Sequence, residues 1–128
     1  MKLLSVNVGL PREIEWQGKL VRTSIFKSPV SGNVRVKTLN LEGDEQSDLS
    51  VHGGVHKAVY AYPSEHYRFW REEVPGIDLP LGVFGENFTI PERDLWVCRL
   101  WLDYGVRKAQ PDATLHIDRS RAPDGGAW

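Results

Sequence analysis

Apolar and polar residues alternate near the start of the chain, and a period of two residues predicts strands. In the segment LLSVNV, Ser5 and Asn7 separate aliphatic side chains, which is the pattern of a strand with one buried face. β-Forming residues on both sides of Gln17 and Gly18 predict a hairpin over residues 13–26. Two-residue turns that contain glycine are the usual hairpin connection.

Further runs of β-forming residues predict strands over residues 33–39, 57–63 and about 95–102. The segment SEHYRFWREEV has the helical spacing of apolar residues, which predicts one clear helix near residues 64–74, with Ser64 as the candidate N-cap. The sum is a mainly β (α+β) chain with one helix, and we expect a small β-barrel.

Composition excludes several classes of protein. The 128 residues are enough for one domain with its own core. A net charge of −1 argues against a nucleic-acid-binding protein, and no apolar run is long enough to cross a membrane. The N-terminal segment is predicted to be a strand and not a signal peptide. The single cysteine, Cys98, permits no internal disulfide and fits a reducing compartment, so a cytoplasmic location is expected.

The segment SVHGGVHKAVYAYP, residues 50–63, carries the first candidate chemistry. His52 and His56 are four residues apart, a spacing that places two imidazoles together on a helix. The two glycines between them disfavour a helix, and on a strand the two Cα atoms would lie roughly 13 Å apart. A zinc site is therefore a weak interpretation, and turn histidines without a special role are the simpler alternative.

An anion site is the better-supported interpretation of the same segment. Gly53 and Gly54 permit backbone conformations in which successive N–H groups converge on one anion. Lys57 follows directly, and Lys27 precedes the Pro29 turn, so either could add a positive charge. The alternative is that both lysines are simply solvated strand ends.

Three other residues are candidates. Asp44 in LEGDEQ could accept hydrogen bonds from a ligand, or it could cap a turn. Asn87 in FGENF could bind a heterocycle edge through its amide, or it could satisfy the local backbone. Cys98 in WVCRL is expected to be a buried, unreactive thiol.

Taken together, TSIFKSPVSGNVRV, LNLEGDEQSDLSVHGGVHKAVYAYPSEHYRFW and FGENFT resemble the MOSC domain, named from the C-terminal part of molybdenum cofactor sulfurases. The similarity is to the stand-alone bacterial branch and covers about residues 1–90. It implies a β-barrel-type fold that binds the molybdenum–pterin cofactor in a cleft. It also implies that the cofactor-binding residues are those at the positions of the family motifs, namely Lys27, Asp44, His52, Gly53, Gly54, Lys57 and Asn87. His56 falls at a position that varies in the family.

The resemblance implies an oxidoreductase that reduces N-hydroxylated compounds, with a small-molecule substrate and a separate electron donor. Members continue after FGENFT into a segment like Q-P-R-x-P-C, whose cysteine is the expected molybdenum ligand. Here that segment is missing, and Cys98 comes too early to replace it. We therefore expect a single, incomplete MOSC-like domain over residues 1–128, with a divergent tail from residue 91 that a frameshift or truncation would explain. The alternative function is a non-catalytic cofactor-binding or sulfur-carrier module.

Overall fold

The computed structural model describes residues 3–37, 40–45, 47, 59–100 and 114–115. More of these residues lie in strands than in helices, so the prediction of a mainly β chain with a helix near residues 64–74 is confirmed. In chain order the elements are β1 (Ser5–Val8), β2 (Arg12–Trp16), β3 (Lys19–Thr23), β4 (Ser28–Pro29), β5 (Val34–Arg35), β6 (Ala61–Pro63), α1 (Ser64–Glu73), β7 (Phe88–Ile90), a 3₁₀ helix (Glu92–Asp94), α2 (Leu95–Leu100) and β8 (Thr114–Leu115).

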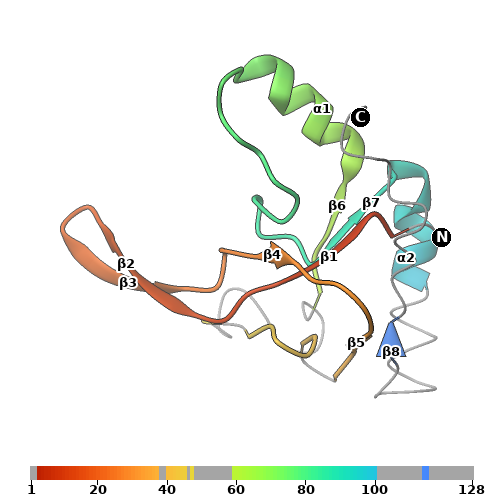
Figure 1. Cartoon of the computed structure of the whole chain (residues 1–128), viewed down its shortest axis with the longest axis horizontal. Coiled ribbons are helices and arrows are strands. Elements are labelled where there is room, and N and C mark those ends of the chain that lie inside the picture. Colours follow the sequence, from red (N-terminus) through yellow and green to blue (C-terminus); the bar gives the residue numbers. More distant parts are fainter. Residues whose placement is uncertain (1–2, 38–39, 46, 48–58, 101–113, 116–128) are drawn as a thin grey trace.

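The centre of the structure is a four-stranded sheet in the order β4-β1-β7-β6 (Figure 1). β1 is antiparallel to both of its neighbours, and Ser5 faces Thr89 across the β1–β7 pair. β6 and β7 are parallel, and the connection between them contains α1, as parallel strands require a crossover. No closed barrel is traced by the pairings of the described strands.

The predicted hairpin is confirmed as the pair β2–β3, which projects from the central sheet as an arm (Figure 1). Its turn consists of Gln17 with φ 50° and Gly18 with φ 75°. Two successive positive φ angles define a type I′ turn, whose twist matches that of the flanking strands. The arm is therefore specified locally by its own turn and by β-forming residues.

The core lies where β1 and β7 meet the segment around β5. Seven buried apolar side chains form it, namely Val6, Val34, Val36, Leu41, Phe88, Ile90 and Cys98. β1 differs from its predicted half-buried pattern, because the polar Ser5 and Asn7 are buried as well. Their hydrogen-bonding partners lie inside the structure, so burial leaves their polar groups satisfied.

The predicted strand near residues 95–102 is wrong, because residues 95–100 form the helix α2. Leu95 and Cys98 are three residues apart and lie against the core, whereas Trp96 and Val97 are exposed. A spacing of three places two side chains on one helical face but on opposite faces of a strand. The core contacts therefore favour the helix over the β preference of these residues.

The start of α1 also differs in detail from the prediction. Pro63 occupies the N-cap position, and its side chain makes no capping hydrogen bond. Ser64 is the first helical residue, and its hydroxyl donates to the side chain of Glu65 at 3.3 Å. Among the described residues, no helix has the length and apolar character needed to cross a membrane.

Candidate functional site

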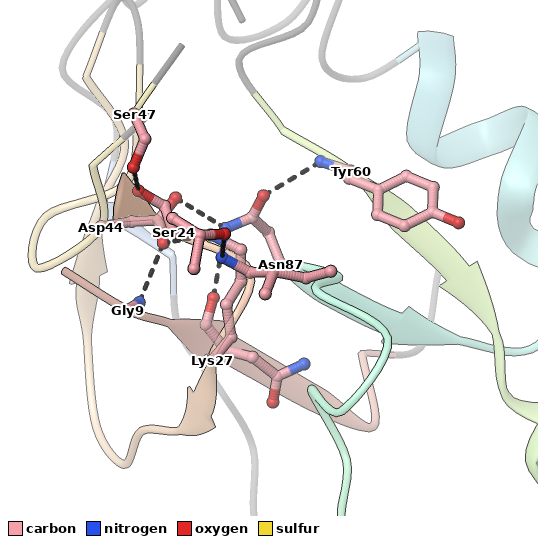
Figure 2. Close-up of polar contacts among 10 residues, drawn as sticks. Gly9, Ser24, Lys27, Asp44, Ser47, Tyr60 and Asn87 are labelled. Atoms are coloured by element: carbon pink, nitrogen blue, oxygen red, sulfur yellow. Dashed lines mark hydrogen bonds and ion pairs between the residues drawn. The ribbon is translucent and has the colours of Figure 1, made fainter. Parts of the chain in front are cut away.

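The carboxylate of Asp44 is the centre of a buried polar network (Figure 2). Its Oδ1 accepts hydrogen bonds from the backbone N–H of Gly9 at 2.9 Å and from Nζ of Lys27 at 2.5 Å. Its Oδ2 accepts from Nδ2 of Asn87 at 3.0 Å. A turn that includes Gly43, with φ 85°, places the carboxylate there. Three candidate residues from separate segments thus meet at one group.

Lys27 is not a solvated strand end, contrary to one of the interpretations above. Its side chain is 8% exposed and that of Asp44 is 2% exposed, so the ion pair between them is buried. A buried lysine requires such a partner, because an unpaired charge in the interior is very costly. The positive charge of Lys27 is therefore already balanced by Asp44 and is not presented as an unpaired cation.

The side-chain amide of Asn87 forms hydrogen bonds within the protein through both its nitrogen and its oxygen. Nδ2 donates to the backbone oxygen of Asn7 at 3.2 Å as well as to Asp44, and Oδ1 accepts from the backbone N–H of Tyr60 at 3.1 Å. Figure 2 shows the amide between the Asp44 carboxylate and the Tyr60 backbone. With these hydrogen bonds made, both amide N–H groups of Asn87 are used, and Asn87 joins the start of β7 to β1 and to the segment before β6.

A second buried network adjoins the first, and sequence reasoning did not single it out. Oε1 of Glu86 accepts hydrogen bonds from the hydroxyl of Tyr67, from the N–H of Gly82 at 3.0 Å and from the hydroxyl of Thr89 at 2.9 Å. In the part of the chain that the structure describes, Oε2 of the same carboxylate has no hydrogen-bonding partner. The sequence feature that could have indicated this network is Glu86, an acidic residue between the two aromatic residues of FGENF.

The two networks are connected through Asn7. Its side-chain Nδ2 donates to Oγ1 of Thr89 at 3.2 Å, and its backbone oxygen accepts from Asn87. The path of hydrogen bonds runs from Lys27 to Asp44 and Asn87, and then through Asn7 and Thr89 to Glu86. A continuous polar path of this kind fixes the relative positions of the segments that it joins.

Burial sets the ionisation of two groups in this region. The pKa of the Tyr67 hydroxyl is raised far above its usual range, first by burial and then by its hydrogen bond to Glu86 and by the charge of that residue. Tyr67 therefore remains a neutral donor. Burial likewise raises the pKa of the Cys98 thiol to about 11, so the thiol is protonated near neutral pH.

The remaining candidates lie outside the described residues, namely His52, Gly53, Gly54, His56 and Lys57. Among the described residues, no group of three histidine, cysteine or acidic side chains is placed to hold a metal ion. The structure thus brings Lys27, Asp44 and Asn87 together and separates Cys98 from them in the core.

Comparison with known proteins identifies relatives of this chain. A family model described as the MOSC domain matches residues 48–123. The chain is 47% identical over 88 residues to the uncharacterized protein YflK of Bacillus subtilis, an alignment that covers 69% of this chain and 39% of YflK. It is 45% identical over 69 residues to protein YiiM of Escherichia coli, covering 52% of this chain and 31% of YiiM.

A reductase of Gibberella moniliformis is 36% identical over 124 residues, covering 94% of this chain and 21% of the reductase. The crystal structure of YiiM from Geobacillus stearothermophilus aligns with a TM-score of 0.46 at 34% identity, covering 71% of this chain and 38% of the other. Each alignment thus covers less than half the length of the curated relative.

Proposed function

Because this chain belongs to the MOSC domain family, we propose that it binds the molybdenum–pterin cofactor and acts in the family's reduction of N-hydroxylated compounds. The observation that carries the proposal is the network of Lys27, Asp44 and Asn87. It joins residues from the three motifs on which the family resemblance rests. Their common location supports a single cofactor site beside this network.

The residues of the network suit a supporting role in that site. Lys27, Asp44 and Asn87 bond to one another and to backbone groups. In this proposal they contribute to the cofactor site by fixing the positions of the segments around it. In this proposal the N–H groups of Gly53 and Gly54 and the charge of Lys57 hold the cofactor phosphate. Paired glycine amides beside a cation are well suited to a phosphate.

The described residues do not provide a suitable ligand for the molybdenum ion. A molybdenum ligand of the expected type is an accessible thiolate, whereas the Cys98 side chain is 1% exposed and packs in the core. Its protonated thiol does not fit a ligand role. We therefore derive no chemical step through the metal from these residues, and binding of the pterin phosphate is the core of the proposal.

The alternative is a non-catalytic cofactor-binding or sulfur-carrier module, and the burial of Cys98 favours it. The relative named as a reductase, whose alignment covers 94% of this chain, favours the oxidoreductase. If the chain is catalytic, it needs a small-molecule substrate and a separate electron donor. We also propose a cytoplasmic location. The chain is further proposed to be a single domain in which residues 91–128 diverge from the family pattern.

Cofactor analysis tests the proposal. The chain is purified from a host that makes molybdenum cofactor, and its molybdenum is measured by mass spectrometry and its pterin by fluorescence after oxidation. We expect near-stoichiometric pterin in the wild type and a large loss in Lys57→Met. Lys37→Met, which removes an exposed lysine, is the matched control and retains the pterin. Absence of pterin from the wild-type protein would overturn the proposal.

Turnover separates the two functional candidates. Protein that contains pterin is assayed for reduction of a hydroxylamine with a chemical electron donor. Reduction above the level of the Lys57→Met variant supports the oxidoreductase, and its absence in protein that holds both pterin and molybdenum supports the non-catalytic module.

A further inference from the structure

The β2–β3 arm has an apolar face that the rest of the described structure leaves exposed. Ile14 and Val21 face each other across the two strands, and Trp16 is beside them at the turn. Trp16 is 61% exposed and Val21 is 38% exposed. β2 and β3 pair only with each other among the described strands, and Figure 1 shows them projecting from the central sheet. A two-stranded sheet alone is marginally stable in water.

The turn determines which backbone groups of the arm point outward. In a two-residue hairpin the flanking residues, Trp16 and Lys19, exchange hydrogen bonds, and bonded and non-bonded pairs then alternate along the strands. The non-bonded pairs are Glu15 with Leu20 and Glu13 with Arg22. Their N–H and C=O groups therefore face away from the hairpin and form its two edges.

The β2 edge opposes pairing with a second copy of itself. The outward residues of β2 are Glu13 and Glu15. Antiparallel pairing of two β2 edges would use these residues for its hydrogen bonds, and each register would place one glutamate opposite another. Like charges directly opposite each other destabilise a sheet, and charged residues are a common protection of exposed edges.

The β3 edge, in contrast, favours pairing with the β3 edge of a second copy. In an antiparallel pairing of two β3 strands about Val21, each Leu20 lies opposite Arg22 of the second copy, and each Lys19 lies opposite Thr23. No like charges lie directly opposite each other, and each Arg22 has Glu13 of its own hairpin opposite it. On the apolar face, Ile14 and Val21 of one copy continue into Val21 and Ile14 of the other. The result is a row of four β-branched side chains, a favourable cross-strand combination.

We propose that the chain forms a two-fold dimer through its β3 edge, giving a four-stranded sheet in the order β2-β3-β3-β2. The second copy supplies the edge partner that each hairpin lacks among the described strands, and it covers part of Leu20, which is 78% exposed in one chain. This proposal is independent of cofactor binding.

Disulfide trapping tests the register. Val21 lies opposite its own counterpart in a non-hydrogen-bonded pair, where Cα atoms are about 4.5 Å apart, within the range that a disulfide bridges. Val21→Cys should therefore crosslink under mild oxidation, and Leu20→Cys, placed opposite Arg22, should crosslink far more slowly. Random collision would give the reverse order, because Leu20 is the more exposed residue. Cys98 is buried and does not interfere.

Proline substitution tests the edge without an introduced thiol. Arg22→Pro removes an outward N–H from β3, and Glu13→Pro removes one from β2. Proline is tolerated where a strand N–H faces solvent. The two variants are matched, because each one removes the cross-strand pair of Glu13 and Arg22. The wild type and Glu13→Pro should show a mass that rises toward the dimer with concentration in sedimentation equilibrium, and Arg22→Pro should remain monomeric. Circular dichroism checks that both variants fold. A monomeric wild type, or equal crosslinking of both cysteine variants, overturns the proposal.

Discussion

The hydroxyl of Tyr67 donates a hydrogen bond to Oε1 of Glu86, and both side chains are buried, at 1% and 0% exposure. Tyr67 belongs to α1 and Glu86 to the turn before β7, so the bond joins the helix to the segment that carries Asn87. Oε2 of Glu86 has no hydrogen-bonding partner among the described residues, so the carboxylate depends on the hydrogen bonds to Oε1.

Tyr67→Phe should lower the free energy of unfolding by about 1–3 kcal/mol, since it removes a donor from a buried acceptor. Urea denaturation measures the change. Tyr62→Phe is the matched control, because the Tyr62 hydroxyl accepts from Nε1 of Trp70 in an exposed position. That variant should change stability by no more than about 0.5 kcal/mol. Equal losses in the two variants would contradict this account of the Glu86 carboxylate.

The same bond predicts how stability depends on pH. The folded-state pKa of Tyr67 lies above the unfolded value of about 10. Above that pH the unfolded chain releases the tyrosine proton while the folded chain keeps it, so the free energy of unfolding falls as pH rises. The stabilisation is fully present below about pH 10.

Tyr67→Phe should have a shallower decline in this alkaline range. Some decline should remain, because the pKa of Tyr60 is also raised, first by burial and then by Tyr62 and Glu86. Urea titrations at several alkaline pH values make the comparison. Parallel curves for the wild type and Tyr67→Phe would contradict the assignment to Tyr67.

The Lys27–Asp44 pair should show strong energetic coupling. Removal of one partner of a buried ion pair leaves an uncompensated charge and costs about 3–5 kcal/mol. Lys27→Met and Asp44→Asn together should therefore destabilise the protein by less than the sum of the single changes, with a coupling of about 0.5–3 kcal/mol. A double-mutant cycle in urea measures it.

The exposed pair of Arg68 and Glu72 is the internal comparison for that cycle. Both side chains are 70% exposed, and the atoms Nε and Oε1 lie 3.5 Å apart. A pair of this kind contributes about 0.3–0.5 kcal/mol. Similar coupling energies for the two pairs would show that the burial of Lys27 and Asp44 has no energetic consequence.

Cys98 should behave as a core residue and not as a metal ligand. Its thiol, with a pKa of about 11 and 1% exposure, should react with a disulfide reagent only after denaturation. Cys98→Ser should leave the molybdenum content per mole of pterin unchanged, although it should lower stability by about 1–3 kcal/mol through burial of a hydroxyl. Cys98→Ala controls for that hydroxyl. A large loss of molybdenum in both variants would show that Cys98 is a ligand.

Local patterns were sufficient for the hairpin and for α1. The Gln17–Gly18 turn and the helical spacing of Tyr67 and Trp70 act over short distances, so the prediction needs no tertiary information. α2 was mispredicted because Trp96 and Val97 are β-forming residues, while the preference for a helix comes from the contacts of Leu95 and Cys98 with a distant core. Such contacts leave no local signal in a short segment.

The candidate site likewise has features that local sequence indicates and features that depend on tertiary contacts. Single residues such as Asp44 and Asn87 were recognisable from their motifs, but their mutual hydrogen bond spans 43 residues of sequence. The buried state of Asn7 depends on Thr89, 82 residues away, so an asparagine between two valines was naturally taken as solvent-facing. The polar interior between β1 and β7 is a tertiary feature, which a pattern of period two cannot distinguish from an exposed face.

The position of β1 between β4 and β7 has a consequence for how the chain folds. β1 is synthesised early, yet its N–H and C=O groups on one side bond to residues 87–89, among them the bond from the N–H of Asn7 to the oxygen of Asn87 at 2.7 Å. β4 can pair with β1 soon after translation, whereas β7 arrives only after β6 and α1. Long-range pairing of this kind slows folding. We therefore expect the joining of β1 to β7 to limit the folding rate, and the nascent chain to expose an unpaired edge of β1 to aggregation until that step is complete.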